Sequence, residues 1–169
     1  MRNQASDLRR DRRLRGAVAA RGHYPGAAVS QDLDAFRVRG EGRFPGHLGV
    51  EVIDVRSGSS EMRLEIRPHH VAPNGFLHAG VVVGLADSAC GYGCVASLPE
   101  GGVNFATIEV KTNFLGTMTE GTIGCRARMV HGGRTTQVWD AEVVDAATGR
   151  ALALFRCTQL IVYPASDRG

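Results

Sequence analysis

The sequence predicts an α+β domain in which a curled antiparallel sheet of about six strands wraps around one long central helix. Two observations support this fold class. The run from His78 to Ser97 is apolar on nearly every side when placed on a helix, and strand-like runs stand before and after it in the chain. A helix that is apolar all round must be enclosed by the rest of the protein. A curled sheet would enclose it with few elements.

Alternation of apolar and polar residues predicts the strands. The strand-like runs are 48–55, 61–67, 105–115, 122–130, 135–144 and 151–162. Short segments rich in glycine separate them, as expected of hairpin turns. Before the helix, residues 44–47 are interpreted as a turn, and 68–77 as a loop because of their prolines and an Asn-Gly pair.

A chain of 169 residues fits one globular domain, which we place at residues 41–163. Residues 1–40 form an extension rich in Arg, Ala and Gly, and 164–169 form a short tail. The extension is interpreted as a loosely held segment or a short surface helix, with a nucleic-acid or membrane arm as the alternative. The net charge of the chain is +3, and much of the positive charge lies in the first fifteen residues, so the domain is nearly neutral and no nucleic-acid partner is expected.

The four cysteines lie in apolar segments without the spacing of metal ligands. We interpret them as buried, reduced thiols of a cytoplasmic protein. No apolar core followed by a cleavage site marks a secretory signal. The apolar helix is interrupted by Gly84 and Asp87 and falls short of the ~20 residues that span a membrane, so no membrane partner is expected. His69 and His70 are adjacent, which is a poor arrangement for one metal ion, and no metal site is predicted.

Asp87 is the single carboxylate in the middle of this apolar helix. A carboxylate in such surroundings either finds hydrogen-bond donors or has its pKa raised towards that of a general base. On a helix, Gly80, Gly84 and Gly91 share the face of Asp87, so we expect room there for a ligand or a second chain. A structural carboxylate, capped or bound to water, is the alternative.

The helix start is a second candidate for chemistry, because its first N–H groups have no partners within the helix. Gly75 and Gly80 would let a substrate carbonyl approach the N–H of Ala79, where an oxyanion would be stabilised. Asp87 follows Ala79 by eight residues, which is about 12 Å along a helix. If both groups act on one bond, they must come from two chains with antiparallel helices. The sequence therefore suggests a site at a subunit interface.

Several segments resemble a known family. The run 74–80 (Asn-Gly-Phe-Leu-His-Ala-Gly) and Leu-Ala-Asp-Ser-Ala at 85–89 resemble the signature of hotdog-fold acyl-CoA thioesterases, in the phenylacetate-degradation (PaaI-like) branch. Further similar segments are Thr-Ile-Glu at 107–109, Asn-Phe at 113–114, Gly-Arg-Thr at 133–135 and Phe-Arg-Cys-Thr-Gln at 155–159. The likeness covers about residues 44–162, with motifs, spacing and element order in agreement.

This resemblance implies hydrolysis of an acyl-CoA thioester by a homodimer or homotetramer, with no cofactor. It implies that Asp87 attacks the thioester or activates water, while the N–H of Ala79 from the other subunit polarises the carbonyl. His78 would support the turn at the helix start. Thr107 would orient the water or Asp87.

The resemblance also assigns residues to substrate and CoA binding, namely Asn74, Gly75, Gly80, Gly91, Arg134 and Thr135. Arg134 would lie near the CoA phosphates or the pantetheine arm; an ordinary solvated charge is the alternative. Ala79 stands where relatives carry glycine, which is tolerable because only its N–H is needed. Ala72 stands where relatives often carry Asn or Gln. Either Asn74 takes over the role of that side chain, or the role is vacant in this chain.

The acyl group is expected to be aromatic or medium-chain, in an apolar pocket formed by Phe76, Leu77, Tyr92 and Phe114. Other functions are a non-catalytic acyl-CoA sensor and a hotdog hydratase. A hydratase needs a histidine beside the carboxylate, and the nearest candidate, His47, stands in the wrong order along the chain. A thiol nucleophile at position 90 or 94 would have only the histidine at 78 nearby to activate it.

Overall fold

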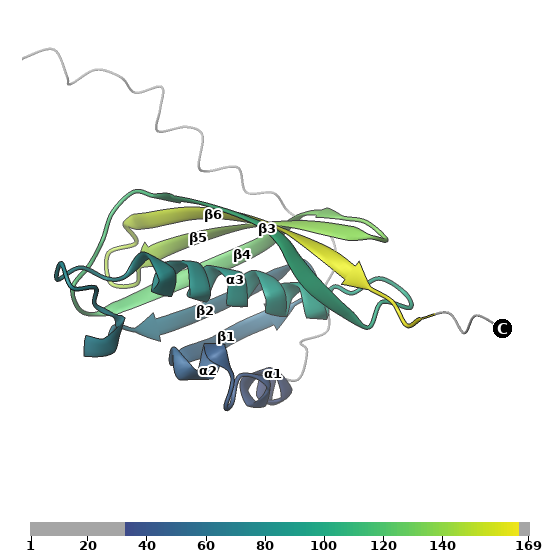
Figure 1. Ribbon diagram of the computed structural model, residues 1–169, viewed down its shortest axis with the longest axis horizontal. Coiled ribbons are helices and arrows are strands. Elements are labelled where there is room, and N and C mark those ends of the chain that lie inside the picture. Colours follow the sequence, from purple (N-terminus) through teal and green to yellow (C-terminus); the bar gives the residue numbers. More distant parts are fainter. Residues whose placement is uncertain (1–32, 166–169) are drawn as a thin grey trace, which may run out of the picture.

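The computed structural model describes residues 33–165, and in it one antiparallel sheet of six strands curls around a long helix (Figure 1). The strand order is β1-β2-β4-β5-β6-β3, so β1 and β3 form the two edges of an open sheet. The strands are Val50–Arg56 (β1), Ser59–Glu65 (β2), Asn104–Phe114 (β3), Thr122–Gly132 (β4), Thr136–Asp145 (β5) and Ala151–Val162 (β6). The predicted fold class is confirmed.

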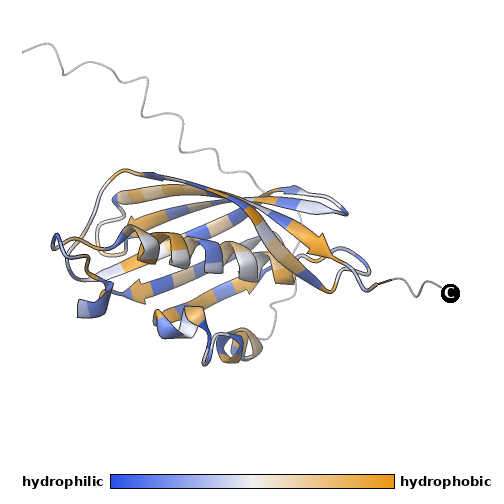
Figure 2. Cartoon of the chain, viewed as in Figure 1, coloured by the Kyte–Doolittle hydropathy of each residue, from blue (hydrophilic) through white to orange (hydrophobic). Residues whose placement is uncertain are grey.

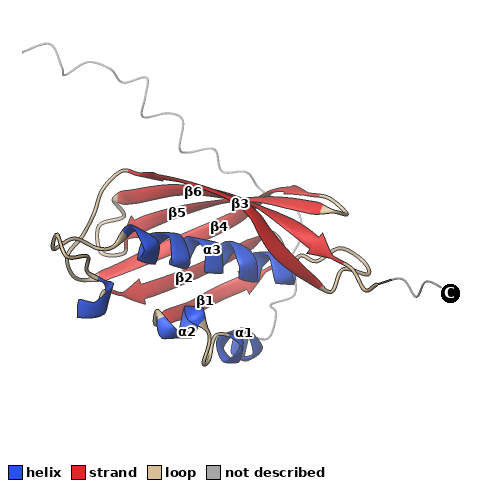
Figure 3. Ribbon diagram, in the orientation of Figure 1, coloured by secondary structure: helices blue, strands red, loops and turns tan. Residues whose placement is uncertain are grey.

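The helices are Leu33–Arg39 (α1), Phe44–His47 (α2) and Ala79–Ala96 (α3), with a 3-10 turn at Pro68–His70 (η1). Figure 3 shows α3 along the inner face of the sheet, with α1 and α2 beside β1. The predicted central helix is confirmed, with His78 and Ser97 as its caps. Its place between β2 and β3 in the chain leaves β3 to pair at the far edge, with β6.

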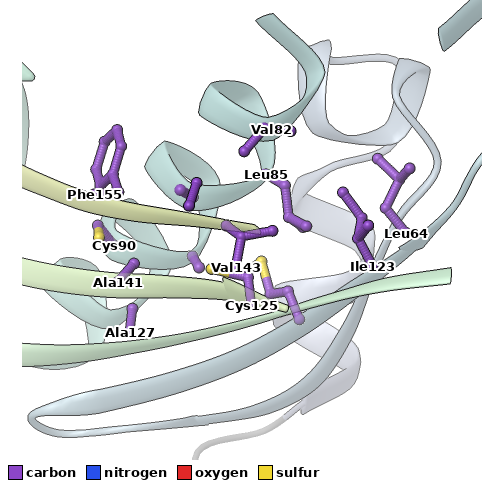
Figure 4. Packing of buried hydrophobic residues seen from close by; sticks show 14 of the residues in the cluster. Leu64, Val82, Leu85, Cys90, Ile123, Cys125, Ala127, Ala141, Val143 and Phe155 are labelled. Carbon is purple, nitrogen blue, oxygen red and sulfur yellow. The ribbon is translucent and has the colours of Figure 1, made fainter. Parts of the chain in front are cut away.

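The core lies between α3 and the sheet. Met62 of β2, Leu85 of α3 and Trp139 of β5 are completely buried. In Figure 4 the side chain of Leu85 points from the helix towards Ile123 and Val143 of the sheet. Burying a side chain of this size contributes about 1.5–3 kcal/mol. The period-two alternation along the strands, visible as colour bands in Figure 2, supplies the apolar inner face that the helix requires.

The outer face of the sheet is charged. Asp140 of β5 accepts hydrogen bonds from Arg156 on β6, at 2.6 Å from Nε, and from Arg128 on β4, at 3.2 Å. The Arg156 guanidinium holds the pKa of the Asp140 carboxyl below its usual range. Acidic and basic side chains alternate across this face, which therefore carries no field of one sign.

The glycines of α3 are explained by close packing within the chain. A Cβ at Gly93 would lie 2.5 Å from the Trp139 ring, and a Cβ at Gly91 would lie 2.8 Å from the ring of Phe105. Gly84 is covered by Leu48 in the same way, at 2.7 Å. The expected room beside Gly84 and Gly91 is thus filled by side chains of the same chain. Glycine is needed there because the sheet and α2 approach the helix closely.

The N-terminal part departs from the sequence-based expectation at residues 44–47, whereas α1 agrees with the short surface helix expected within residues 1–40. Residues 44–47 form a helical turn, not a loop turn, because Pro45 stands at the start of a helix, where its missing N–H is not needed. Helix α1 packs on the domain through Phe36, which is 6% exposed and lies 5.7 Å from the Tyr92 ring. The charged cluster at 9–13, the rest of residues 1–32 and the tail residues 166–169 lie outside the described residues.

One helix within residues 33–165 is long and apolar enough to cross a membrane, and it is α3. Most of its apolar window is buried inside the domain, 61% by residue. Its hydropathy is accounted for by its position against the sheet.

Candidate active site

The start of α3 presents a backbone donor. The side chain of His78 caps the helix, with Nδ1 accepting from the N–H of Gly80 at 2.9 Å, and the N–H of Val81 donates to the carbonyl of His78. Among the described residues, no acceptor is recorded for the N–H of Ala79. It lies on an exposed turn at the positive end of the helix dipole. Such a group can bind a carbonyl oxygen or an oxyanion.

The loop before α3 fixes this geometry. The N–H of His78 donates to the carbonyl of His70 at 2.9 Å, and the N–H of Leu77 donates to the carbonyl of Met118 at the same distance. Gly80 is required by the cap, because a Cβ there would lie 3.0 Å from Nδ1 of His78. The His78 imidazole thus accepts the N–H of Gly80, and the N–H of Ala79 remains available as a donor.

Asp87 lies half-buried in the middle of α3. Burial raises the pKa of its carboxyl group, and the hydroxyl of Thr107, 3.3 Å from Oδ1, lowers it by a smaller amount. No cation contributes to this pKa among the described residues. A carboxylate of this kind is suited to act as a general base or as a nucleophile.

Thr107 connects Asp87 to a buried polar chain. Its hydroxyl oxygen also lies 2.9 Å from Oε1 of Gln159, and Nε2 of Gln159 lies 3.3 Å from Sγ of Cys157. Gln159 is completely buried on the inner face of β6, directly opposite Thr107 in the pairing of β3 with β6. No role for Gln159 was predicted from the sequence. The available signal was a polar residue at an inward position of an otherwise apolar strand.

The two candidate reactive groups do not meet within one chain. Ala79 and Asp87 stand eight residues apart on the same helix, which places them about 12 Å apart along its axis. The structure brings Thr107 to Asp87 and His78 to the helix start. Within one chain, the N–H of Ala79 and the carboxylate of Asp87 therefore remain separate.

Of the predicted substrate-binding residues, Gly80 and Gly91 belong to α3 like Asp87, and the other four lie apart from it in loops and turns. Oδ1 of Asn74 accepts from the N–H of Phe76 at 3.2 Å and so closes a local turn, and Gly75 has the positive φ of 85° that this turn requires. Arg134 lies over the Tyr163 ring, 5.1 Å from its centre, and accepts the Tyr163 hydroxyl at its carbonyl oxygen. The carbonyl of Thr135 accepts from the N–H of Ile161.

A cavity of about 160 Å³ lies beside the helix start. Its lining consists of Leu77, Ala79, Val82, Phe114, Gly116, Thr117 and Leu152. Leu77 and Phe114 were predicted to line the acyl pocket. Phe76 and Tyr92 are not among the lining residues, since Phe76 is 49% exposed in its loop and Tyr92 packs against Phe36. The cavity is apolar and open to the donor at the helix start.

The cysteines and histidines offer no competing chemistry. All four cysteines are free and buried, as predicted, and burial raises the pKa of the Cys90 thiol far above its usual value. A thiol so hard to ionise is a poor nucleophile. His70 is buried, with Nδ1 accepting from the N–H of Arg67, and His69 packs against its ring. Residues 33–165 contain no group of three or more His, Cys, Asp or Glu side chains arranged around a metal site.

The curled sheet around one long helix is the hotdog fold of thioesterases, and in this chain the helix carries a carboxylate in its middle and a backbone donor at its start. The family model described as the thioesterase superfamily matches residues 74–152. A 1,4-dihydroxy-2-naphthoyl-CoA hydrolase of Listeria monocytogenes is 32% identical over 66% of this chain and 89% of its own length. The chain belongs to the thioesterase superfamily and is a thioester hydrolase.

Solved structures agree with this assignment. The crystal structure of a mutant of thioesterase PA1618 from Pseudomonas aeruginosa superposes with a TM-score of 0.74 at 25% identity, covering 80% of this chain and 96% of that one. The PaaI protein of Escherichia coli, from the phenylacetic acid degradation operon, gives a TM-score of 0.68 at 23% identity, covering 76% and 90%. The second likeness bears on the fold alone.

Proposed function

We propose that this protein hydrolyses acyl-CoA thioesters with Asp87 of one subunit and the N–H of Ala79 of another. The observation that carries the proposal is the pair of half-sites on α3: a half-buried carboxylate of raised pKa and an unpartnered donor at the helix start. A thioesterase needs both functions, a base or nucleophile and an oxyanion donor.

In the general-base form of the reaction, Asp87 takes a proton from water as the water oxygen bonds to the thioester carbon. The carbonyl oxygen becomes an oxyanion, which the Ala79 N–H of the other subunit stabilises. When the carbonyl re-forms, the carbon–sulfur bond breaks, and the CoA sulfur leaves as a thiolate that receives the proton from Asp87. The products are the free acid and CoA. In the nucleophilic form, Asp87 itself bonds to the carbon, the carbon–sulfur bond breaks and CoA leaves as a thiolate. Water then hydrolyses the resulting anhydride, which releases the free acid, regenerates the Asp87 carboxylate and supplies the proton that the CoA sulfur takes up.

The edge strand β3 supports a site shared by two subunits. It pairs with β6 on one side only, and its side chains Ile108, Val110 and Phe114 are 57%, 50% and 49% exposed. A long apolar edge invites pairing with a second strand. Two copies joined at β3 about a twofold axis would bring their helices together in antiparallel directions. The helix start of one copy would then approach the carboxylate of the other.

The substrate is proposed to be an aromatic acyl-CoA. The Listeria monocytogenes relative is named for a naphthoyl-CoA, and the cavity beside Ala79 is lined by apolar side chains that include Phe114. Medium-chain acyl-CoA is the second candidate, since an apolar pocket fits both. Arg134 stands exposed at the β4–β5 turn, where its charge suits the CoA phosphates. Four buried free thiols fit a reducing compartment such as the cytoplasm.

The test is release of CoA from a panel of acyl-CoAs, followed with a thiol reagent. Wild type should cleave aromatic thioesters with the highest kcat/KM. Asp87→Asn and Asp87→Ala should lose activity by at least about 100-fold, the scale of losing a base or nucleophile. Asp54→Asn on the outer face of β1 is the matched control and should retain it. Binding without turnover by wild type would favour a sensor, and hydration of an enoyl-CoA would favour a hydratase.

A further inference from the structure

Gln159 is a buried polar residue that the reaction as described does not use. It has no exposed surface, and it stands on β6 opposite Thr107 of β3 and opposite Gln137 of β5. A buried amide needs partners for both its oxygen and its nitrogen, because an unpaired buried polar group is costly. Its two partners are Thr107, at 2.9 Å, and Cys157, at 3.3 Å. A polar chain therefore runs from Asp87 through Thr107 and Gln159 to Cys157.

The hydrogens of this chain can point in one of two directions. Thr107 has one hydroxyl hydrogen, so it cannot donate to Asp87 and to the Gln159 oxygen at the same time. If it donates to the amide oxygen at 2.9 Å, then Asp87 must be protonated to make a hydrogen bond with the Thr107 oxygen. The amide nitrogen then donates to Cys157. Each of the three contacts then pairs one donor with one acceptor, with Asp87 neutral.

A half turn of the Gln159 amide reverses the chain. The nitrogen now donates to the Thr107 oxygen, the Thr107 hydroxyl donates to an ionised Asp87, and the Cys157 thiol donates to the amide oxygen. The turned amide fits the same space, because its oxygen and nitrogen, which exchange places, are nearly equal in size. Each one satisfies one protonation state of the carboxylate.

We propose that Gln159 is a positioning residue for the hydrolysis, which holds Asp87 through Thr107 in both of its protonation states by turning its amide. The inference rests on the proposed function, in which Asp87 gains a proton from water and later returns it to the leaving sulfur. Gln159 touches neither substrate nor water. It keeps the carboxylate oriented while its charge changes.

The register of β3 and β6 builds this arrangement. The pairing shifts between Thr107 and Glu109, so Ile108 is the extra residue of a bulge that directly follows Thr107. A bulge of this kind re-aims the neighbouring side chains. It leaves Thr107 facing inward between Asp87 and Gln159.

Within residues 33–165, no other group that ionises readily is recorded around this polar chain. Cys90, one turn along α3 from Asp87, is close to Cys157, and burial raises the pKa of its thiol far above the usual value. Strand β5 contributes the uncharged Gln137 and Trp139 opposite Gln159 and Cys157. Asp87 is thus the group whose protonation sets the direction of the chain.

A double-mutant cycle tests the coupling. Gln159→Met keeps the length of the side chain but removes the amide, and we expect kcat to fall about tenfold with KM unchanged, the size of one hydrogen bond. In a Thr107→Val background, where the path to Asp87 is already cut, the same change should cost no further activity. In a Thr107→Ser background, which keeps the hydroxyl, Gln159→Met should again lower kcat. An equal loss in the Thr107→Val background, or wild-type kcat in Gln159→Met, would overturn the proposal.

Gln137→Met is the matched control. Gln137 is equally buried on the neighbouring strand, but its amide donates to the Ser97 carbonyl and accepts from the Trp139 indole, away from Asp87. Its replacement should lower Tm and leave kcat within about twofold of wild type. A merely structural role of Gln159 predicts the same behaviour for both glutamine variants.

The isosteric Gln159→Glu gives a second readout if the methionine variant fails to fold. A second acid in the chain competes for the Thr107 hydroxyl and disfavours ionisation of Asp87, so the acid limb of the kcat/KM profile should move to higher pH. An unchanged limb contradicts the proposal. If Asp87→Asn retains activity, the proposed function itself fails; if it is inactive while all Gln159 variants behave as wild type, this inference alone fails.

Discussion

At the scale of the residue, Asp87 shows a conflict between stability and activity. The helix around it is apolar because it is enclosed by the sheet, and a carboxylate in that place loses hydration without gaining a cation. Thr107 supplies one hydrogen-bonding group at 3.3 Å. Such a poorly compensated charge is typical of functional sites.

Asp87→Asn is therefore expected to raise Tm at pH 7 while abolishing hydrolysis. Burial raises the folded-state pKa of the Asp87 carboxyl above its ordinary value, so the folded protein binds this proton more tightly than the unfolded chain. Stability is lost as pH rises from the unfolded value to the raised folded value, and the loss persists above it. The Asn side chain of the variant has no charge to bury and carries no such cost. The Tm advantage of the variant over wild type should therefore shrink towards about pH 4. Thermal unfolding at both pH values measures this.

Asp54→Asn is the control for this prediction, because Asp54 lies on the outer face, paired with Arg56. It should give no gain in Tm at pH 7. A Tm of Asp87→Asn at or below that of wild type at pH 7 would show that the buried charge is compensated in a way that the contacts do not account for.

At the scale of the element, α3 is a helix made of poor helix formers. Each glycine in its interior costs about 1 kcal/mol relative to alanine. Gly91 and Gly93 face aromatic rings of the sheet, and the absence of a side chain at these positions lets the helix approach the sheet closely. Packing, not propensity, selects these residues.

Gly93→Ala should destabilise the fold although alanine favours the helix. The new Cβ would meet the ring of the fully buried Trp139 at 2.5 Å, and overpacking of a core typically costs ~1–3 kcal/mol. Chemical denaturation would show a lower midpoint. Gly124→Ala is the control, since its Cβ meets only Val144, at 3.6 Å, and it should be neutral or slightly stabilising. Equal stability of both variants would show that the Trp139 ring yields freely.

Strand β3 is the other element with an unusual property. Ten residues of β3 pair with residues of β6, yet side chains on both faces of β3 remain exposed. Native proteins protect a long edge with charge, proline or a partner. Residues 104–114 contain no proline and two charged side chains, Glu109 and Lys111, so most of this edge is uncharged and is open to the partner strand that we propose.

Val110→Lys should dissociate the proposed dimer and reduce activity with it. Val110 is 50% exposed in the middle of β3, and a charge at the edge opposes pairing with a second copy. Sedimentation velocity would show a shift from dimer to monomer. Val38→Lys, on the exposed side of α1, is the control and should remain dimeric. A Val110→Lys protein that stays dimeric would place the interface elsewhere.

At the scale of the whole molecule, the helix and strands could be predicted well from the sequence, and the contacts between residues far apart in the chain less well. The helix at 78–97 and the six strands follow from periodicity, which is a local property. The turn predicted at 44–47 was wrong because Pro45 fits a helix start as well as a turn. Gly91 was interpreted as space for a ligand, although its neighbour is Phe105 of β3. Such neighbours depend on tertiary packing.

The candidate site shows the same division. Asp87 was identified from its surroundings within the helix, and Ala79 from its place at the helix start. Gln159 was given no role because its position opposite Thr107 depends on the register of β3 and β6, which a bulge after Thr107 shifts by one residue. The distance between Ala79 and Asp87 could be calculated from the sequence, since it lies within one helix.

That distance leads to a prediction about the assembled molecule. Ala79→Pro removes the donor while suiting the first position of a helix, and His78 already has the φ of −65° and ψ of 132° that precede a proline. Ala79→Pro and Asp87→Asn homodimers should each lose at least about 100-fold in kcat. In a heterodimer of the two variants, one of the two sites combines an intact donor from one chain with an intact carboxylate from the other. Co-expression with two different affinity tags isolates this heterodimer, which should recover about half of the wild-type kcat. If donor and carboxylate acted from the same chain, each site would keep one defect, and the heterodimer would be as inactive as its parents.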